Sequence, residues 1–275
     1  MSKTIEMSMN EIAKRKPTKL DFKALEENRT RAKKLSDAFN PAVVTSKEPV
    51  LVAGDWHVPY QDRELVLQLY KVAEEFGIKT LLVPGDFWDC DNLKNEEKFV
   101  SMTYLETFQT EKIEVAKQLE EMLTKFKRVC FCRGNHEKRW LKVNKGMVGI
   151  DELFAITKVK GNFQVSLDNH IALYQGDSKW LLCHPHNYSP AQLNVAFSLA
   201  DKHHCNIFSA HGHQMAQGHD RTGEFQIVDG GGMFDADQIE YLRTSTTFPS
   251  VYSGFYMIAD GKAYKFEGHE SKRII

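Results

Sequence analysis

The stretch VCFCRGNHEKRW, residues 129–140, begins with four apolar residues and passes directly into the polar run RGNHE. Four apolar residues in a row are typical of a buried strand, whereas Asn, His and Glu can bind ligands or exchange protons. The same transition occurs at four other places, which are PVLVAGDWH (49–57), KTLLVPGDFWD (79–89), KWLLCHPH (179–186) and CNIFSAHGHQ (205–214). The sequence therefore predicts five buried strands that each end in polar side chains.

Helical patterns separate the first three of these strands. Leu65, Leu69, Val72 and Phe76 have helical spacing, and Gly77 follows as a C-cap. A long helix is expected over residues 95–127, with Ile113, Ala116, Leu119 and Leu123 on one face, and a shorter one over residues 191–204. The fold class is therefore α/β, with strands that need cover on both faces.

The C-terminal half is richer in strands. EFQIVDGGGMF and SGFYMIADGKAYKFEG are expected to form antiparallel strands, the second as a hairpin that turns at Asp260-Gly261. Residues 1–48 are polar and charged, and are interpreted as a partly helical N-terminal arm. Residues 49–275 are predicted to form the main domain.

The composition sets limits on function. The net charge is −1 and the pI is about 6.8, so no overall charge favours nucleic acid or a membrane. No apolar run approaches the roughly 18 residues of a membrane span, and the N-terminus lacks the apolar core of a secretory signal. The five cysteines have no C-x-x-C spacing and are interpreted as core residues in a reducing cytoplasm.

The polar residues at the strand ends predict a metal centre. If the strands share one sandwich, their carboxylates and imidazoles meet at short range, which is costly unless a cation holds them. Two ions can be assigned, with Asp86 as the bridging ligand. The first has Asp55, His57, Asp86 and His213, and the second has Asp86, Asn135, His184 and His211.

The donor types decide the metals and the chemistry. Oxygen and imidazole donors favour Mn²⁺, with Fe, Zn²⁺, Ni²⁺ or Mg²⁺ as alternatives. Two divalent ions carry four positive charges and two carboxylates cancel only two, so the site attracts an anion. A water shared by the ions would lose a proton readily and become a nucleophile near neutral pH.

The ordered set D-W-H, G-D-F-W-D, G-N-H-E, H-P-H and A-H-G-H resembles the calcineurin-like metallophosphoesterase superfamily. The spacing is similar to phage, prophage and bacterial members, in which an arginine, here Arg139, follows G-N-H-E. The resemblance implies a β-sandwich of mixed sheets flanked by helices, with a dinuclear metal centre. It also implies that His136 protonates the leaving oxygen or steadies transition-state charge, and that Asp89 orients His136.

Two positions depart from the superfamily pattern. Ala210 stands where the fifth motif has glycine, which is a small change. Cys90 stands where the Ser/Thr protein phosphatases of the superfamily have a phosphate-binding arginine. This difference favours a phosphodiesterase, a nuclease or nucleotide hydrolase, over a phosphomonoesterase or protein phosphatase. A non-catalytic scaffold that retains the fold is a further alternative.

Several other residues are candidates for substrate binding. Arg139, close to the site in sequence, and His186 are the first candidates, and Arg133, Lys138 and Arg221 could also bind phosphate. Surface ion pairing is the default expectation for the four cationic residues, and a hydrogen-bonded loop histidine is the alternative for His186. Trp56, Phe87 and Trp88 are expected to pack in the core rather than stack on bases. The expected partner is a phosphate ester and not a membrane, while the physiological substrate and the oligomeric state stay open.

Overall fold

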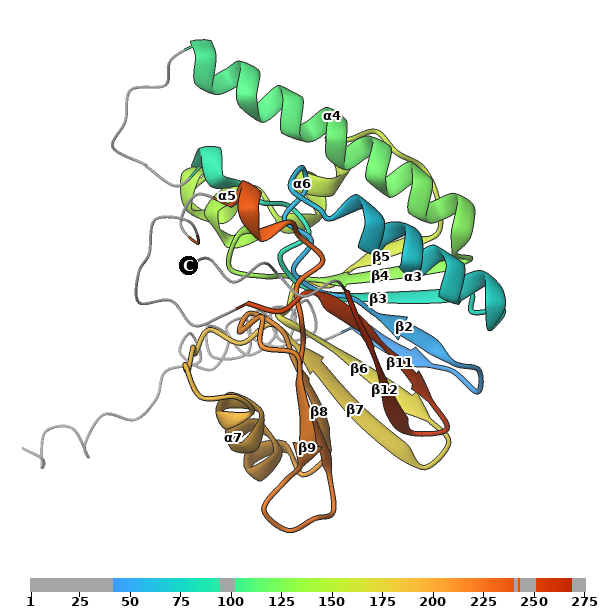
Figure 1. The fold of residues 1–275 in the computed structure, drawn as a ribbon. Helices are drawn as coiled ribbons and strands as arrows, with labels where there is room; N and C mark the ends of the chain where they lie inside the picture. The colour runs from blue at the N-terminus through green and yellow to red at the C-terminus, as the bar shows by residue number, and fades with distance from the viewer. Residues whose placement is uncertain (1–41, 94–101, 240–241, 243–250, 269–275) are drawn as a thin grey trace, which may run out of the picture. The chain divides into compact units, whose positions relative to one another are not determined.

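The computed structural model describes residues 42–93, 102–239, 242 and 251–268. Two six-stranded sheets lie face to face in this part of the chain, with helices over their outer faces (Figure 1). In spatial order, the first sheet contains β1 (Ala42–Thr45), β6 (His170–Gln175), β7 (Ser178–Cys183), β8 (Asn206–Ser209), β10 (Gln226–Asp229) and β9 (Ala216–His219). The second contains β12 (Lys262–Glu267), β11 (Gly254–Ala259), β2 (Val50–Val52), β3 (Thr80–Pro84), β4 (Arg128–Cys132) and β5 (Phe163–Val165).

Both sheets are mixed. Strands β2 to β5 run parallel to one another, as do β7, β8 and β10, whereas β11 and β12 run antiparallel to their neighbours. This arrangement confirms the predicted sandwich of mixed sheets. It also places the carboxyl ends of β2, β3 and β4 at one edge of their sheet, where ligand sites of α/β folds collect.

Strand β3 shows why the apolar runs are continuous. Leu81 and Val83 point to the layer packed against α3 and α4, whereas Leu82 belongs to the layer between the two sheets. Successive side chains of a strand point to opposite faces, so a strand covered on both sides needs an apolar residue at every position. The expectation that these strands are buried on both faces is confirmed.

The helices are α3 (Arg63–Glu75), α4 (Met102–Lys125), α5 (Glu137–Val143), α6 (Ile150–Ala155) and α7 (Asn194–His203), with short 3-10 turns η1 (Asp91–Leu93) and η2 (Ala236–Gln238). Figure 1 shows α3 and α4 over the sheet that contains β2 to β5, and α7 beside β8 and β9. Asp62 begins α3, because its carboxylate accepts from the main-chain N–H groups of Glu64 and Leu65.

The predicted face of the long helix is partly wrong. Ile113 is 52% exposed, whereas Glu111 and Gln118 are buried. These polar side chains have distant partners: Glu111 accepts from the main-chain N–H of Cys90 (2.8 Å), and Gln118 donates to the Tyr70 hydroxyl (2.8 Å). Because the partners come from other segments, the apolar period of the helix does not reveal which face is buried.

The other predicted elements compare as follows. Leu65, Leu69 and Val72 of α3 are buried as predicted, but Phe76 is 55% exposed and lies just past the end of the helix. Strands β11 and β12 form the predicted hairpin, in which Asp260 and Gly261 both have positive φ.

The N-terminal boundary differs from the expectation. Strand β1 pairs in parallel with β6 although it lies within the range 1–48 assigned to the arm, so the sheet begins before residue 49. Residues 1–41 and 95–101, which include most of the predicted arm and the start of the predicted long helix, lie outside the described residues. All five cysteines are buried and unpaired, as expected. None of the helices in the described ranges is long and apolar enough to cross a membrane.

Candidate metal centre

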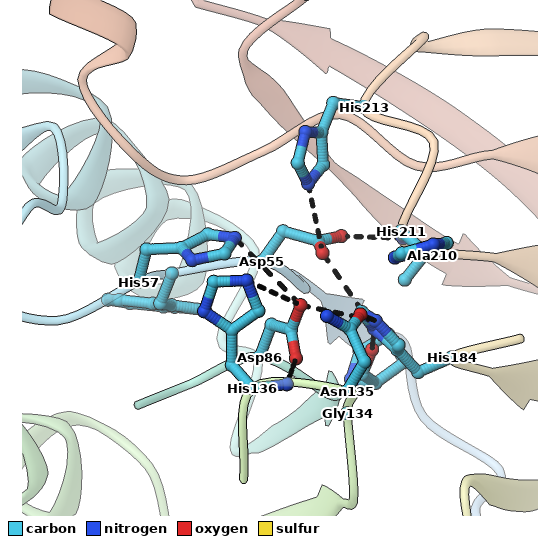
Figure 2. Close-up of polar contacts among 12 residues, drawn as sticks. Asp55, His57, Asp86, Gly134, Asn135, His136, His184, Ala210, His211 and His213 are labelled. Atoms are coloured by element: carbon cyan, nitrogen blue, oxygen red, sulfur yellow. Dashed lines mark hydrogen bonds and ion pairs between the residues drawn. The ribbon is translucent and has the colours of Figure 1, made fainter. Parts of the chain in front are cut away.

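Five strand ends deliver their polar side chains to one place (Figure 2). Seven candidate ligands were predicted from the sequence, and the structure brings all of them together: Asp55 and His57 after β2, Asp86 after β3, Asn135 after β4, His184 after β7, and His211 and His213 after β8. Possible ligand atoms converge in three overlapping groups: Asp55, His57 and His213; His57, Asp86 and His136; and Asp86, His184 and His211. Within each group these atoms lie within 4.8 Å of one another.

Asp86 lies at the middle of this cluster. Its Oδ2 atom is 3.2 Å from Nε2 of His184 and 4.0 Å from Nε2 of His57. Its Oδ1 atom accepts the main-chain N–H of His136 (2.8 Å), which fixes the orientation of the carboxylate. One carboxylate therefore faces imidazoles on two sides, as a bridging ligand must.

Acceptor atoms face one another around His184. Its Nδ1 lies 3.2 Å from the carbonyl oxygen of Pro84, which can only accept a hydrogen bond. In the neutral ring Nδ1 then carries the proton, and the lone pair of Nε2 faces Oδ1 of Asn135 at 2.8 Å and Oδ2 of Asp86 at 3.2 Å. Three lone-pair donors at this range require either a proton on Nε2 or a cation, and they suit a divalent metal.

His57 offers a second such atom. Its Nδ1 lies 2.9 Å from Oδ1 of Asp89, while its Nε2 is buried and has no hydrogen-bond partner among the described residues. A carboxylate that holds one ring nitrogen and leaves the other bare is the usual support of a metal-binding histidine. The residues present therefore fit a bound metal.

The backbone is strained at most of the candidate ligands. Asp55, His57, Asp86, His211 and His213 all have positive φ, between 47° and 76°. Residues other than glycine rarely adopt this conformation, and such strain concentrates at functional sites. The strain aims five side chains at one point, which a regular strand or helix end would not do.

The electrostatics of the cluster follow from burial and close pairing. Burial would raise the pKa of Asp86, but His184 and His136 outweigh it and hold the pKa well below its usual value. Burial would lower the pKa of His184, yet Asp86 and Asp55 raise it to about 9. His211 behaves in the opposite way, because burial and the neighbouring His184 lower its pKa to about 4.

The predicted pair of Asp89 and His136 is adjacent, although the carboxylate is shared. Nδ1 of His136 lies 2.5 Å from the main-chain oxygen of Asp89 and 3.2 Å from its Oδ1. The same Oδ1 holds His57, so Asp89 supports two imidazoles. Arg139 also joins this group, with Nη1 donating to the main-chain oxygen of Asp89 (2.9 Å) and Nη2 lying 3.0 Å from Nε2 of His136.

Glu137 is a site residue for which sequence reasoning gave no role. Its buried carboxylate accepts the main-chain N–H groups of Asp86 (3.1 Å), Trp88 (2.9 Å) and Gly134 (2.8 Å). It therefore ties the loop after β3 to the loop after β4. The G-N-H-E motif held the signal, because an acidic residue at the start of a helix needs partners when it is buried.

Replacing Glu137 by alanine is expected to destabilise the fold by about 3 kcal/mol or more, because three buried N–H groups lose their acceptor and each costs about 1–3 kcal/mol. Glu137→Gln retains one acceptor oxygen and should lose less. Urea unfolding of metal-free protein measures both variants. Glu114→Ala is the control, since Glu114 pairs with Lys117 on the exposed face of α4. Equal stability of Glu137→Ala and wild type would contradict the role of Glu137.

Gly134 allows the close approach of Asp86. A Cβ atom on Gly134 would lie 2.0 Å from Oδ1 and 2.3 Å from the main-chain nitrogen of Asp86. Gly134→Ala should displace Asp86 and lower kcat/KM about 100-fold, the loss expected from a misplacement of about 1 Å.

Gly212→Ala is the matched control for this change. Gly212 lies between His211 and His213, and a Cβ there would meet no atom nearer than 3.9 Å. It should remain within a few-fold of wild type in kcat/KM. Similar losses in both alanine variants would show that the contact with Asp86 is not the cause.

Phe234 is a second residue that the sequence analysis missed. Its ring packs edge-on against His57 (centroids 5.0 Å apart) and against His213 (4.7 Å). It follows Gly230, Gly231 and Gly232, and that glycine run after a strand was the available signal.

The remaining candidates lie in different surroundings. Cys90 is fully buried, as are the three aromatic residues Trp56, Phe87 and Trp88, which confirms that these aromatic residues pack in the core. His186 is exposed beside the cluster. Arg221 pairs with Asp201 (3.0 Å) on the surface, so surface pairing, the default expectation for it, is what the structure shows.

The comparison with protein families agrees with this geometry. The model of the calcineurin-like phosphoesterase family matches residues 48–250, which is more than half of the chain. The chain therefore belongs to the calcineurin-like phosphoesterase family. Together with the buried aspartate and histidine clusters, membership indicates a divalent metal centre. No curated protein matches the sequence.

Solved structures with a similar chain course are distant in sequence. Vps29 from Chaetomium thermophilum is 11% identical with a TM-score of 0.43, and the matched region covers 82% of this chain and 93% of the Vps29 chain. Vacuolar Protein Sorting 29 from Cryptosporidium parvum is 17% identical with a TM-score of 0.41, covering 80% and 98%. A predicted phosphoesterase from Streptococcus pneumoniae TIGR4 is 11% identical with a TM-score of 0.34, covering 81% and 99%.

Proposed function

We propose that this chain is a two-metal phosphoesterase that hydrolyses phosphodiesters of nucleic acids or nucleotides. The observation that carries the proposal is the position of Asp86 between two groups of donors. Asp55, His57 and His213 would hold one ion with Asp86, and Asn135, His184 and His211 would hold the other. The five buried, unpaired cysteines suit a reducing compartment, and we propose the cytoplasm.

Two divalent ions in this site would polarise the phosphoryl oxygens and lower the pKa of a bound water. The chain's own contribution is to orient the reacting groups. Asp89 accepts hydrogen bonds from Nδ1 of both His57 and His136. The Nε2 atoms of the two rings are therefore turned toward Oδ2 of Asp86, at 4.0 Å from His57 and 3.9 Å from His136. His136 is thereby placed to donate a proton from Nε2 to the departing oxygen.

Arg139 controls the proton on His136. In the structure Nη2 of Arg139 lies 3.0 Å from Nε2, and a guanidinium can only donate, so Nε2 carries no proton in this arrangement. Protonated His136 would repel Arg139 from Nε2. Arg139 would then be available to bind substrate oxygens, which agrees with its proposed role in substrate binding.

The preference for diesters rests on the loop after β3. The arginine that protein phosphatases use there is replaced by Cys90, which is fully buried and whose main-chain N–H is held by Glu111. Arg139 instead brings a guanidinium to this loop from α5. Position 90 therefore lacks the guanidinium by which those phosphatases grip a terminal phosphate.

The test compares two chromogenic substrates, bis-p-nitrophenyl phosphate and p-nitrophenyl phosphate, with protein loaded with Mn²⁺ after chelation. We expect faster hydrolysis of the diester, and loss of activity on renewed chelation. Preference for the monoester would assign a phosphomonoesterase. A protein that binds two ions yet hydrolyses neither ester would favour a scaffold.

A further inference from the structure

Three cationic or imidazole side chains come from the segments that follow β4 and β7, and these two segments are in contact. Arg133 precedes Asn135 by two residues, Lys138 lies at the start of α5, and His186 follows His184 by two residues. Asn135 and His184 touch at 2.8 Å, and the main-chain N–H of Arg133 donates to Asp168, whose neighbour Asn169 holds the main chain of His184. The three side chains therefore branch from one small region.

These side chains are close and lack acidic partners. Partial burial lowers the pKa of His186, and the nearby charges of Lys138 and Arg133 lower it further. Within the described ranges, neither Arg133 nor Lys138 has a carboxylate within 4.0 Å, and Nε of Arg133 is buried without a hydrogen-bond partner. In a chain with a net charge of −1, unpaired cations at this place call for an anion.

A pocket of about 840 Å³ begins at His186 and continues between the ends of β6 and β7 and helix α7. His170, Lys202 and His203 also line it, with asparagine and serine side chains between them. No aspartate or glutamate from the described residues belongs to its lining. Of the three side chains only His186 lines this pocket, so the pocket offers room for a polar, anionic group beside His186.

We propose that Arg133, Lys138 and His186 form a subsite for a second phosphate of the substrate, next to the phosphate that is cleaved. Arg133 and Lys138 supply fixed positive charges, and His186 supplies a ring N–H donor. The substrate is then a compound with at least two phosphates, either a phosphodiester chain or a nucleoside polyphosphate. This inference rests on the proposed function, because it places the scissile phosphate at the metal centre.

The test uses Arg133→Gln, Lys138→Gln and the double variant. We expect the double variant to raise KM for a ten-residue oligothymidylate about 10-fold or more, and to leave hydrolysis of bis-p-nitrophenyl phosphate within two-fold of wild type. Arg221→Gln, which removes a cation paired with Asp201 on the surface, is the control and should change neither. Equal losses on both substrates, or no loss on either, would overturn the subsite.

A binding measurement separates this inference from the proposed function. A phosphorothioate oligothymidylate labelled with a fluorophore reports binding whether or not the protein hydrolyses esters. The slope of log K against log salt should become less steep by about 0.7 for each cation removed. An unchanged slope in the double variant would contradict the subsite.

Competition identifies which polyphosphate occupies the subsite. Displacement of the labelled oligothymidylate by unlabelled oligothymidylate but not by ATP assigns the subsite to a phosphodiester chain. Displacement by ATP at a lower concentration than by unlabelled oligothymidylate assigns the subsite to a nucleoside polyphosphate. Either result supports a second-phosphate subsite if the double variant binds the displacing compound more weakly than the wild type does. If the double variant bound both oligothymidylate and ATP as tightly as the wild type does, the subsite would be overturned.

Discussion

Replacing His136 by alanine is expected to lower kcat about 10²- to 10⁴-fold, the range that a positioned general acid contributes. The main-chain N–H of residue 136 would still donate to Oδ1 of Asp86, so the orientation of the central carboxylate is preserved. Bound metal, measured by elemental analysis, should therefore match wild type. A large loss of turnover with unchanged metal content would show that the His136 ring takes part in the reaction and is not needed for metal binding.

The leaving group gives a sharper test of the same variant. An acid matters most when the departing oxygen is a poor leaving group, so the loss should be larger for an alkyl ester than for a p-nitrophenyl ester. His219→Ala, on exposed strand β9, is the control and should behave as wild type. The same loss with both esters would mean that His136 steadies charge rather than donates a proton, and no loss with either would remove it from the reaction.

The convergence of the candidate ligands could be predicted from the sequence because each follows shortly after a buried strand. Asp55, Asp86 and Asn135 come at the ends of three neighbouring parallel strands, whose carboxyl ends must meet at one edge of the sheet. Their placement is thus a consequence of local pattern and strand direction. No tertiary detail was needed to predict that they converge.

The supporting contacts could not be predicted in the same way. Glu137 binds N–H groups that lie about fifty positions earlier in the chain. Phe234 packs on His57 although the two residues are far apart in the sequence. Glu111 of α4 is buried because it caps the N–H of Cys90. Hydrophobic periodicity treats a buried, paired glutamate as a surface residue, so it misjudges Glu111 and Glu137.

Strand β1 shows a related limit. Its sequence AVVT alternates between buried and exposed positions, with Val43 54% exposed. It pairs in parallel with β6, more than one hundred residues further along the chain. A four-residue strand at the edge of a sheet has too little apolar content to stand out from a charged arm.

Replacing Asp86 by asparagine should have the largest effect on the metal centre. The amide keeps the shape and can still accept the N–H of His136, but it removes the negative charge that lies between His57 and His184. Loss of a residue that only supports a ligand costs about 10- to 100-fold in metal affinity, so loss of a bridging ligand should cost more than about 100-fold. We expect fewer than two bound ions and a matching loss of hydrolysis.

The metal-free variant supplies a readout independent of activity. In the wild type, burial works against protonation of His184, but Asp86 and Asp55 raise its pKa to about 9. Of the two carboxylates, Asp86 has the larger effect on His184, so Asp86→Asn should lower the pKa of His184. NMR titration of the ring protons would detect this fall. Asp168→Asn is the matched control, because Asp168 lies 3.4 Å from His170 outside the cluster. If Asp86→Asn kept both ions and the pKa of His184, Asp86 could not be the shared ligand, and the assignment of two adjoining metal sites would have to be abandoned.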